Sequence, residues 1–180
     1  MNRAVLPLLL WAALGCGLGA QDRPAPAIAA PDLGPAVCEA DLDAPVAKVW
    51  AVFTTDEGFK RLGVAKARIE FRVGGRMLSH YDPAGVLGDD GTIENTIMAY
   101  EPQRMVAFRV SRPPKGFPFP NAWQEVWSVV TLTDLGGGRC HLRLAQMGYT
   151  AGEESQRMRG FFLKGNAWVL EHLRKGFAQP

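Results

Sequence analysis

The stretch that decides the fold is residues 150–176, which read TAGEESQRMRGFFLKGNAWVLEHLRKG. Thr150 and Glu153 have the spacing of a capping box, in which each side chain accepts a hydrogen bond from the backbone amide of the other residue. Gly176 follows two cations, as is typical where a helix ends. The stretch therefore predicts one long helix, about 37 Å in length at 1.5 Å per residue.

One face of this predicted helix is apolar and aromatic. At about 100° per residue, eight side chains fall within an arc of roughly 140°. They are Met158, Phe161, Phe162, Gly165, Trp168, Val169, His172 and Leu173. Gly165 costs about 1 kcal/mol relative to alanine within a helix, so it is expected either to allow close contact with a sheet or to leave space for a ligand. A face this wide needs a large partner surface.

The composition is that of one globular domain. The chain has 180 residues, 47% of them hydrophobic and 21% charged. The net charge is +2 and no basic run accompanies it, so nucleic acid is not an expected partner. No phosphate-binding loop and no metal-ligand spacing is present, so neither a cofactor nor a metal is predicted.

Residues 1–20 have the pattern of an export signal, with a short positive start, an apolar run and small residues. Two endings are open. Cys16 sits in an imperfect lipobox and would become a lipidated N-terminus, or cleavage occurs near Ala20, which is slightly favoured. Residues 21–36 are rich in Pro and Ala and read as a linker. We expect an exported domain over residues 37–180 that is periplasmic, secreted or membrane-anchored, with membrane contact only through Cys16.

The residues before the helix predict a sheet. Residues 37–43 alternate as a half-buried strand does, and two short helices follow at 45–55 and 56–62. Turn signals then separate six further strands. These are expected at residues 67–73, 76–81, 92–100, 104–111, 123–133 and 139–149.

Charge supports pairing of the first strand with the last. In an antiparallel arrangement, the strand face that carries Asp41 and Asp43 meets the face that carries Arg143 and His141. The same pairing places Cys38 and Cys140 near opposite ends of the two strands. Their separation would then exceed the ~7 Å limit for a disulfide, so two free, largely buried thiols are predicted.

This order of elements resembles the helix-grip fold of the SRPBCC (START-like) superfamily and, more narrowly, domains similar to the activator of the heat-shock-protein-90 ATPase. The residues that carry the resemblance run in the same order along the chain. They are APVAKVW at 44–50, FT at 53–54, EGF at 57–59, RVGGR at 72–76, Gly91 with Ile93, PQRMV at 102–106, LGGG at 135–138 and the final helix.

The resemblance implies an α+β fold in which a curved antiparallel sheet of about seven strands grips the terminal helix around a cavity. Members of the superfamily bind lipids, sterols, polyketides and other apolar molecules, and some are cyclases or carry metal clusters. The Cys/His motifs of the cluster-binding members are absent here. Members of the co-chaperone kind act on a cytosolic chaperone, and the predicted export signal argues against that role.

Polar candidates for a cavity are few. Hairpin pairing places Ser128 and Gln146 on one inward face, where they are also able to satisfy each other. Tyr81 and Asn95 are further candidates if strand parity turns them inward. His172 lies on the apolar arc and is the best candidate for a general base, although a packing histidine is the favoured interpretation.

Two loops invite a functional interpretation. Residues 112–123 read RPPKGFPFPNAW, and Phe117 and Phe119 either form a stiff lid or fold back onto the sheet or helix. Residues 82–91 contain three aspartates, but they lack the ligand spacing of a calcium loop, so a solvated loop is favoured. His80, just before this loop, is expected to point outward.

These observations favour a non-catalytic binding protein for a small hydrophobic ligand held between the sheet and the terminal helix. The expected ligand contacts are Tyr81, Phe117, Phe119, Ser128, Leu144, Gln146, Phe161, Trp168 and His172. Two alternatives remain. One is an enzyme of the cyclase or hydrolase kind that uses His172, and the other is a protein-interaction module that uses the Phe117/Phe119 loop.

Overall fold

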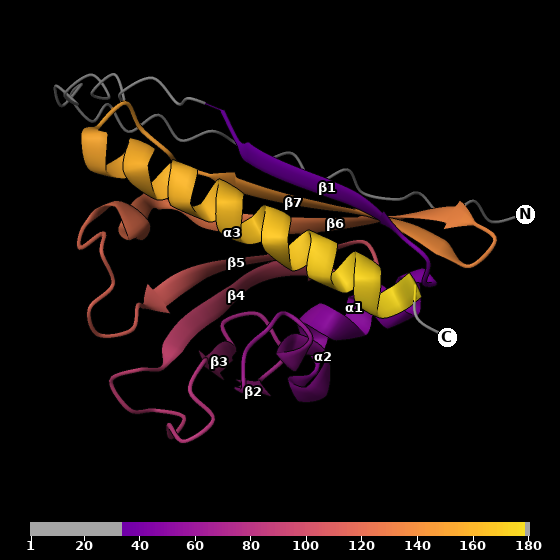
Figure 1. The fold of residues 1–180 in the computed structure, drawn as a ribbon, viewed down its shortest axis with the longest axis horizontal. Coiled ribbons are helices and arrows are strands. Elements are labelled where there is room, and N and C mark those ends of the chain that lie inside the picture. The colour runs from indigo at the N-terminus through magenta and orange to yellow at the C-terminus, as the bar shows by residue number, and fades with distance from the viewer. Residues whose placement is uncertain (1–33, 179–180) are drawn as a thin grey trace, which may run out of the picture.

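The computed structural model describes residues 34–178 of the chain. These residues form one antiparallel sheet with strand order β1-β7-β6-β5-β4-β3-β2 and a long helix, α3, across one face (Figure 1). The elements are β1 (Ala36–Leu42), α1 (Val46–Thr54), α2 (Asp56–Lys60), β2 (Lys66–Ile69), β3 (Arg76–His80), β4 (Ile93–Glu101), β5 (Met105–Arg112), the 3-10 turn η1 (Ala122–Glu125), β6 (Trp127–Gly136), β7 (Arg139–Met147) and α3 (Glu153–Ala178). The predicted α+β helix-grip architecture is confirmed, with seven strands and two short helices after the first of them.

The predicted pairing of β1 with β7 is found, and the predicted charge pattern holds in part, because Asp43 lies beyond the end of β1 and Glu39 takes its place. Asp41 lies opposite His141 in the register, and its Oδ1 is 2.7 Å from His141 Nδ1. One step along the same face, Glu39 Oε1 is 3.0 Å from Arg143 Nε. These pairs lie on the outer face of the sheet, so the charged residues of β1 and β7 have a structural role there.

The two cysteines of the described region are free, as predicted. Cys38 lies opposite Leu144 and Cys140 lies opposite Leu42, so the two thiols are separated along the β1–β7 pair. Cys140 is fully buried, whereas Cys38 is only half-buried.

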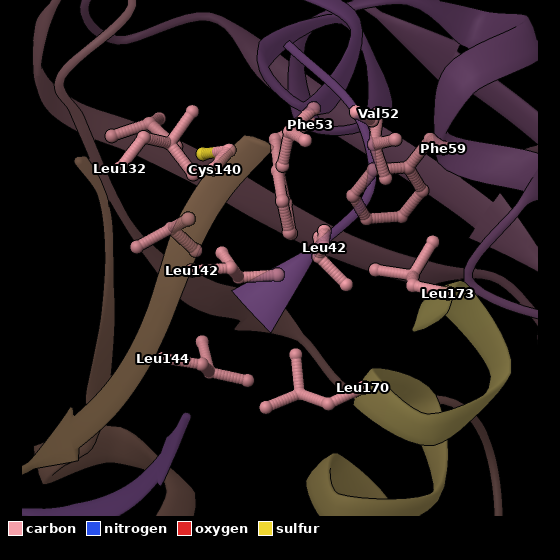
Figure 2. Packing of buried hydrophobic residues seen from close by; sticks show 14 of the residues in the cluster. Leu42, Val52, Phe53, Phe59, Leu132, Cys140, Leu142, Leu144, Leu170 and Leu173 are labelled. Atoms are coloured by element: carbon pink, nitrogen blue, oxygen red, sulfur yellow. The ribbon is translucent and has the colours of Figure 1, made fainter. Parts of the chain in front are cut away.

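The main core joins the sheet to all three helices near the C-terminal end of α3. Figure 2 shows side chains of β1, β6 and β7 meeting those of α1, α2 and α3. The labelled members are Leu42, Val52, Phe53, Phe59, Leu132, Cys140, Leu142, Leu144, Leu170 and Leu173. Full burial of a side chain such as Leu173, which is 1% exposed, contributes about 1.5–3 kcal/mol.

A second core cluster involves the other end of α3. It contains Ala36, Phe119, Val126, Tyr149 and Met158, all of them buried. Met158 belongs to the first turns of α3, and Phe119 belongs to the loop between β5 and β6. The helix is therefore held to the rest of the domain at both ends.

α3 begins at Glu153, two residues later than a capping box at Thr150 predicts, and the capping box does not form. Glu153 pairs with Arg157 one turn further on, at 2.6 Å. The Thr150 amide instead donates to Ser155 Oγ at 2.9 Å. Ser155 is 6% exposed, so a buried hydroxyl takes the amide that the exposed glutamate was expected to bind.

The far end of α3 also differs from the prediction. The helix continues through Gly176 to Ala178. Phe177 packs against the main core, and the Arg61 guanidinium lies 4.1 Å from its ring centroid. The extra turn therefore places an aromatic ring, which outweighs the tendency of glycine to end a helix. None of the helices within residues 34–178 is long and apolar enough to cross a membrane.

The buried face of α3 is rotated relative to the predicted arc. Its buried residues are Ser155, Met158, Leu170 and Leu173. Gly165, Trp168 and His172 are exposed, so their predicted inward positions are wrong. A Cβ added at Gly165 would meet no atom within 4 Å, so this glycine neither allows close contact with the sheet nor leaves space for a ligand.

His80 points away from the inner face of the sheet, but it is not exposed as expected. Residues 82–91 cover its ring, and its exposed fraction is 6%. The Asp82 amide donates to Nδ1 at 2.9 Å, and Nε2 is 3.1 Å from Asp89 Oδ1. Asp89 also accepts from backbone amides of the loop, so its carboxylate organises the loop itself.

The predicted export signal over residues 1–20, Cys16 and most of the predicted linker over residues 21–36 lie outside the described residues. β1 begins at Ala36, so the last residue assigned to the linker belongs to the sheet.

Candidate functional site

A cavity of about 360 Å³ lies between the inner face of the sheet and α3. Its wall is mostly apolar and rich in aromatic rings. The aromatic lining residues are Phe53, Phe59, Tyr81, Phe108, Phe117, Trp123, Phe161 and Phe162. Leu144 of β7 and Leu170 of α3 also line it, and Figure 2 shows these two side chains facing each other across the gap between strand and helix.

The sheet side of the cavity is formed by the inward-pointing residues of neighbouring strands. Successive side chains of a strand point to opposite faces, so lining residues recur at every second position. Phe108 of β5 lies opposite Ser128 of β6, and Ser128 lies opposite Gln146 of β7. All three line the cavity, which extends the inward face predicted for the β6–β7 hairpin to β5.

Gln146 is the centre of a buried hydrogen-bond network at the cavity wall. Its Nε2 donates to Ser128 Oγ at 3.3 Å, as the sequence allowed. Its Oε1 accepts from the Tyr149 hydroxyl at 3.1 Å and from Asn166 Nδ2 at 2.9 Å. Burial raises the pKa of Tyr149, which is fully buried, so the phenol stays protonated and serves as a donor. The network ties α3 to β6 and β7.

A second polar pair faces the cavity from β3 and β4. Ser79 is 2% exposed and Asn95 is 7% exposed, and both line the cavity. Among residues 34–178, neither side chain has a hydrogen-bond partner. Met77 lies opposite Asn95 and Ile93 lies opposite Ser79, so the two polar residues are diagonal neighbours on one face.

The cavity wall carries no charge. Within the described residues, its lining includes no Asp, Glu, Lys, Arg or His. The polar side chains are those of Ser79, Tyr81, Asn95, Ser128, Gln146 and Asn166, with the indole of Trp123. The wall is therefore suited to binding by shape, apolar contact and neutral hydrogen bonds.

The structure brings six of the nine expected ligand contacts to the cavity. These are Tyr81, Phe117, Ser128, Leu144, Gln146 and Phe161. Phe119 is buried beside the cavity but does not line it. Trp168 and His172 lie outside it, stacked on each other at 5.2 Å between ring centroids.

The inward face of α3 is defined by buried Met158, Leu170 and Leu173, and Asn166 lies on this face where it donates to Gln146. Positions 168 and 172 fall on another side of the helix and are exposed. The predicted general base therefore has no place in the cavity wall.

The loop after β5 both folds back and forms part of the cavity wall, so the two interpretations of residues 112–123 each hold in part. Phe117 lines the cavity, and Phe119 packs edge-on against Phe161 of α3 with ring centroids 5.6 Å apart. Glu154 of α3 accepts from the Asn121 amide at 2.8 Å. Hydrogen bonds from backbone amides of this loop lower the pKa of Glu154, which keeps the anchor ionised.

Sequence reasoning missed Ser79 and Asn166 as lining residues. Ser79 lies on the same face of β3 as buried Met77, a signal that was available but weak in so short a strand. Asn166 carried no such signal, because a polar residue on a helix is ordinarily assigned to the solvent face.

Comparison with known proteins agrees with this architecture. The family model for Activator of Hsp90 ATPase homolog 1-like proteins matches residues 43–177. The chain belongs to this family. The family match begins just after β1 and ends within the last turn of α3, so it includes both walls of the cavity. A search of curated proteins found no match.

Solved structures share the fold at low sequence identity. A Mesorhizobium loti protein is 22% identical with a TM-score of 0.60, over 77% of this chain and 93% of its own. A Bacillus halodurans protein is 15% identical with a TM-score of 0.60, over 81% and 98%. An Arthrobacter aurescens protein is 18% identical with a TM-score of 0.60, over 80% and 86%. At these identities the likeness shows the fold alone.

Proposed function

We propose that the protein is a non-catalytic binding protein for a small hydrophobic ligand, which occupies the cavity between the sheet and α3. The observation that carries the proposal is the cavity itself, about 360 Å³ in volume and lined mainly by apolar and aromatic side chains. Pockets for small molecules have volumes of about 300–1,000 Å³ and combine such walls with a few polar groups. The chain belongs to a family whose fold commonly serves in ligand binding or interaction.

The physical basis of binding is burial of apolar surface. Each square ångström of apolar surface removed from water contributes about 25 cal/mol. Both walls of the site are held before a ligand arrives, because Gln146 ties α3 to the sheet and Glu154 ties the 112–123 loop to α3. Such pre-organisation reduces the ordering cost of binding.

The two alternatives have less support. An enzyme that uses His172 would need this ring near a bound ligand, and the ring is exposed and stacked on Trp168. An interaction module that uses the Phe117/Phe119 loop would need free rings, and Phe119 is only 7% exposed. Activation of a cytosolic chaperone is not carried over from the family name, because the predicted export signal would separate the two proteins.

Export is part of the same proposal and rests on the sequence of residues 1–20. In this account, the mature domain binds its ligand in the periplasm, outside the cell or at a membrane to which a lipid on Cys16 anchors it.

Native mass spectrometry of protein purified from its own host tests the binding proposal. We expect a second species heavier than the polypeptide by the mass of a small organic molecule, which denaturing conditions release. A variant with the cavity filled, Val169→Trp, should lack that species, because Val169 lines the cavity. If the wild type carries no extra mass, or if the variant retains the same mass, the cavity is not the binding site.

A further inference from the structure

We propose that the cavity selects an uncharged ligand of about two fused rings that carries an amide-like group, and that Asn95 and Ser79 bind this group. The inference rests on the proposed binding function and adds the chemical class of the ligand. It starts from Ser79 and Asn95, two buried residues of a mostly apolar wall whose polar side chains have no hydrogen-bond partner within residues 34–178.

Asn95 and Ser79 need partners that the protein does not supply. Asn95 carries two N–H donors and a carbonyl acceptor, and Ser79 carries one donor and acceptor lone pairs. Their polar atoms are accessible from the cavity, so an apolar ligand that covers them would leave them unpaired at a cost in free energy, whereas a ligand that pairs with them avoids this cost. A ligand group that both accepts and donates hydrogen bonds, as an amide does, is complementary to this pair.

The register places the two side chains within reach of one ligand group. Asn95 lies opposite Met77, and Ser79 is two residues from Met77 on the same strand face. Diagonal neighbours of this kind are about 7 Å apart, so one polar group between them is able to bond both.

Two other polar residues of the wall are less suited to this role. Tyr81 also has no hydrogen-bond partner among residues 34–178, but it is 64% exposed, so water is able to pair with its hydroxyl. Gln146 already uses its donor on Ser128 and its carbonyl oxygen on two donors. The network fixes the walls, while the polar recognition site lies at β3 and β4.

The uncharged wall selects against ionised ligands. A carboxylate or ammonium in the cavity would lose its hydration, and within residues 34–178 no lining side chain carries an opposite charge. An unpaired buried charge is far more costly than a buried amide that keeps its hydrogen bonds. A neutral ligand should therefore bind better than an ionised one of equal shape.

The volume limits the size of the ligand. A cavity of 150 Å³ with apolar walls accommodates benzene. In proportion, a cavity of about 360 Å³ accommodates about 14 non-hydrogen atoms. This corresponds to two fused rings with a small substituent, and it is too small to enclose a sterol or a two-chain lipid.

Three naphthalene probes of similar shape test the inference by calorimetric titration of the purified full chain at neutral pH. They are 2-naphthamide, which is neutral and polar, 2-naphthoate, which is ionised, and 2-isopropylnaphthalene, which is apolar. We expect 2-naphthamide to bind the wild type at least about tenfold more tightly than 2-naphthoate.

The matched variant is Asn95→Leu, which keeps the side-chain shape and removes the polar atoms. It should weaken binding of 2-naphthamide by about tenfold and leave 2-isopropylnaphthalene bound as tightly or more tightly. Circular dichroism melting checks that the variant folds. If it does not fold, Ser79→Ala replaces it and the same difference between the two neutral probes is expected.

The outcomes separate the inference from the proposed function. Equal binding of 2-naphthamide and 2-naphthoate overturns the ligand class and leaves the binding function standing. If the folded variant changes the affinity for both neutral probes equally, the ligand class is likewise overturned and the binding function still stands. If none of the three probes binds the folded wild type, both the inference and the proposed function are overturned.

Discussion

Replacement of Gln146 by leucine should destabilise the fold strongly, because Gln146 holds a buried hydrogen-bond network together. Gln146 is 6% exposed and Tyr149 is fully buried. Gln146→Leu removes the acceptor of the Tyr149 hydroxyl and of the Asn166 amide. The Tyr149 hydroxyl is then left without a partner in an apolar environment, whereas half-buried Asn166 is able to turn towards water.

The variant also removes the donor to Ser128 Oγ, but Ser128 lines the cavity, where water is able to replace that donor. The expected magnitude therefore follows from the Tyr149 and Asn166 losses. An unsatisfied buried hydroxyl costs about 1–3 kcal/mol, and loss of the Asn166 hydrogen bond costs about 1 kcal/mol. Gln146→Leu should therefore lower the free energy of unfolding by about 2–4 kcal/mol. Tyr149→Phe removes the hydroxyl itself and should cost about 1 kcal/mol. The double variant should cost less than the sum of the single variants, by about 1 kcal/mol or more.

Urea unfolding followed by circular dichroism measures all three variants. Gln124→Leu is the matched control, because Gln124 is exposed on η1 and its replacement should change the free energy of unfolding by less than about 0.5 kcal/mol. The reasoning is refuted if Gln146→Leu behaves like this control, or if the effects of Gln146→Leu and Tyr149→Phe simply add.

Three further predictions concern other regions. Gly165→Ala should raise the free energy of unfolding by up to about 1 kcal/mol, because its added Cβ meets nothing within 4 Å; an unchanged urea midpoint would contradict this. Asp89 accepts hydrogen bonds from the Val86 and Gly91 amides, and these lower its pKa in the folded state. Its contribution to stability is therefore fully present above about pH 4 and is lost as the pH falls through the folded-state pKa. Asp89→Asn should therefore be less stable than the wild type at pH 7, with a gap that narrows under acid unfolding conditions; a gap independent of pH would refute this. His172→Phe should leave the affinity for 2-isopropylnaphthalene unchanged in calorimetry, since the ring lies outside the cavity, and a marked loss would place it in the site.

The sheet was largely predictable because its signals are local and repeat every second residue. Cys38, Ala40 and Leu42 alternate with acidic residues on β1, and β7 supplies the matching bases. Such complementarity identified β7 as the partner of β1, but it did not give the register: Arg143 pairs with Glu39 rather than with a residue of the predicted Asp41/Asp43 pair, and Asp43 lies beyond the end of β1.

The face of α3 was not predictable from apolar periodicity alone. Ser155 and Asn166 lie on the inward face, where they pair with Thr150 and Gln146. Trp168 lies on another side of the helix and is exposed. The periodicity of apolar and aromatic residues takes no account of hydrogen bonds between segments that are distant in the sequence.

His80 shows the same limitation in the sheet. Its strand parity was correct, since it points away from the cavity, yet the 82–91 loop buries it. The volume between sheet and helix is likewise a property of the assembled fold, so the sequence identified Leu144 and Gln146 as inward without deciding whether space remains between them and α3.

The most direct test of ligand binding between the sheet and α3 is the affinity of two tryptophan variants of one helix for 2-isopropylnaphthalene, measured by calorimetry on folded protein. Val169 lines the cavity, while Ala167, two residues away, is exposed. We predict that the wild type and Ala167→Trp bind the probe and that Val169→Trp does not, because the indole fills the site. Binding by Val169→Trp as tight as that of the wild type would contradict the account.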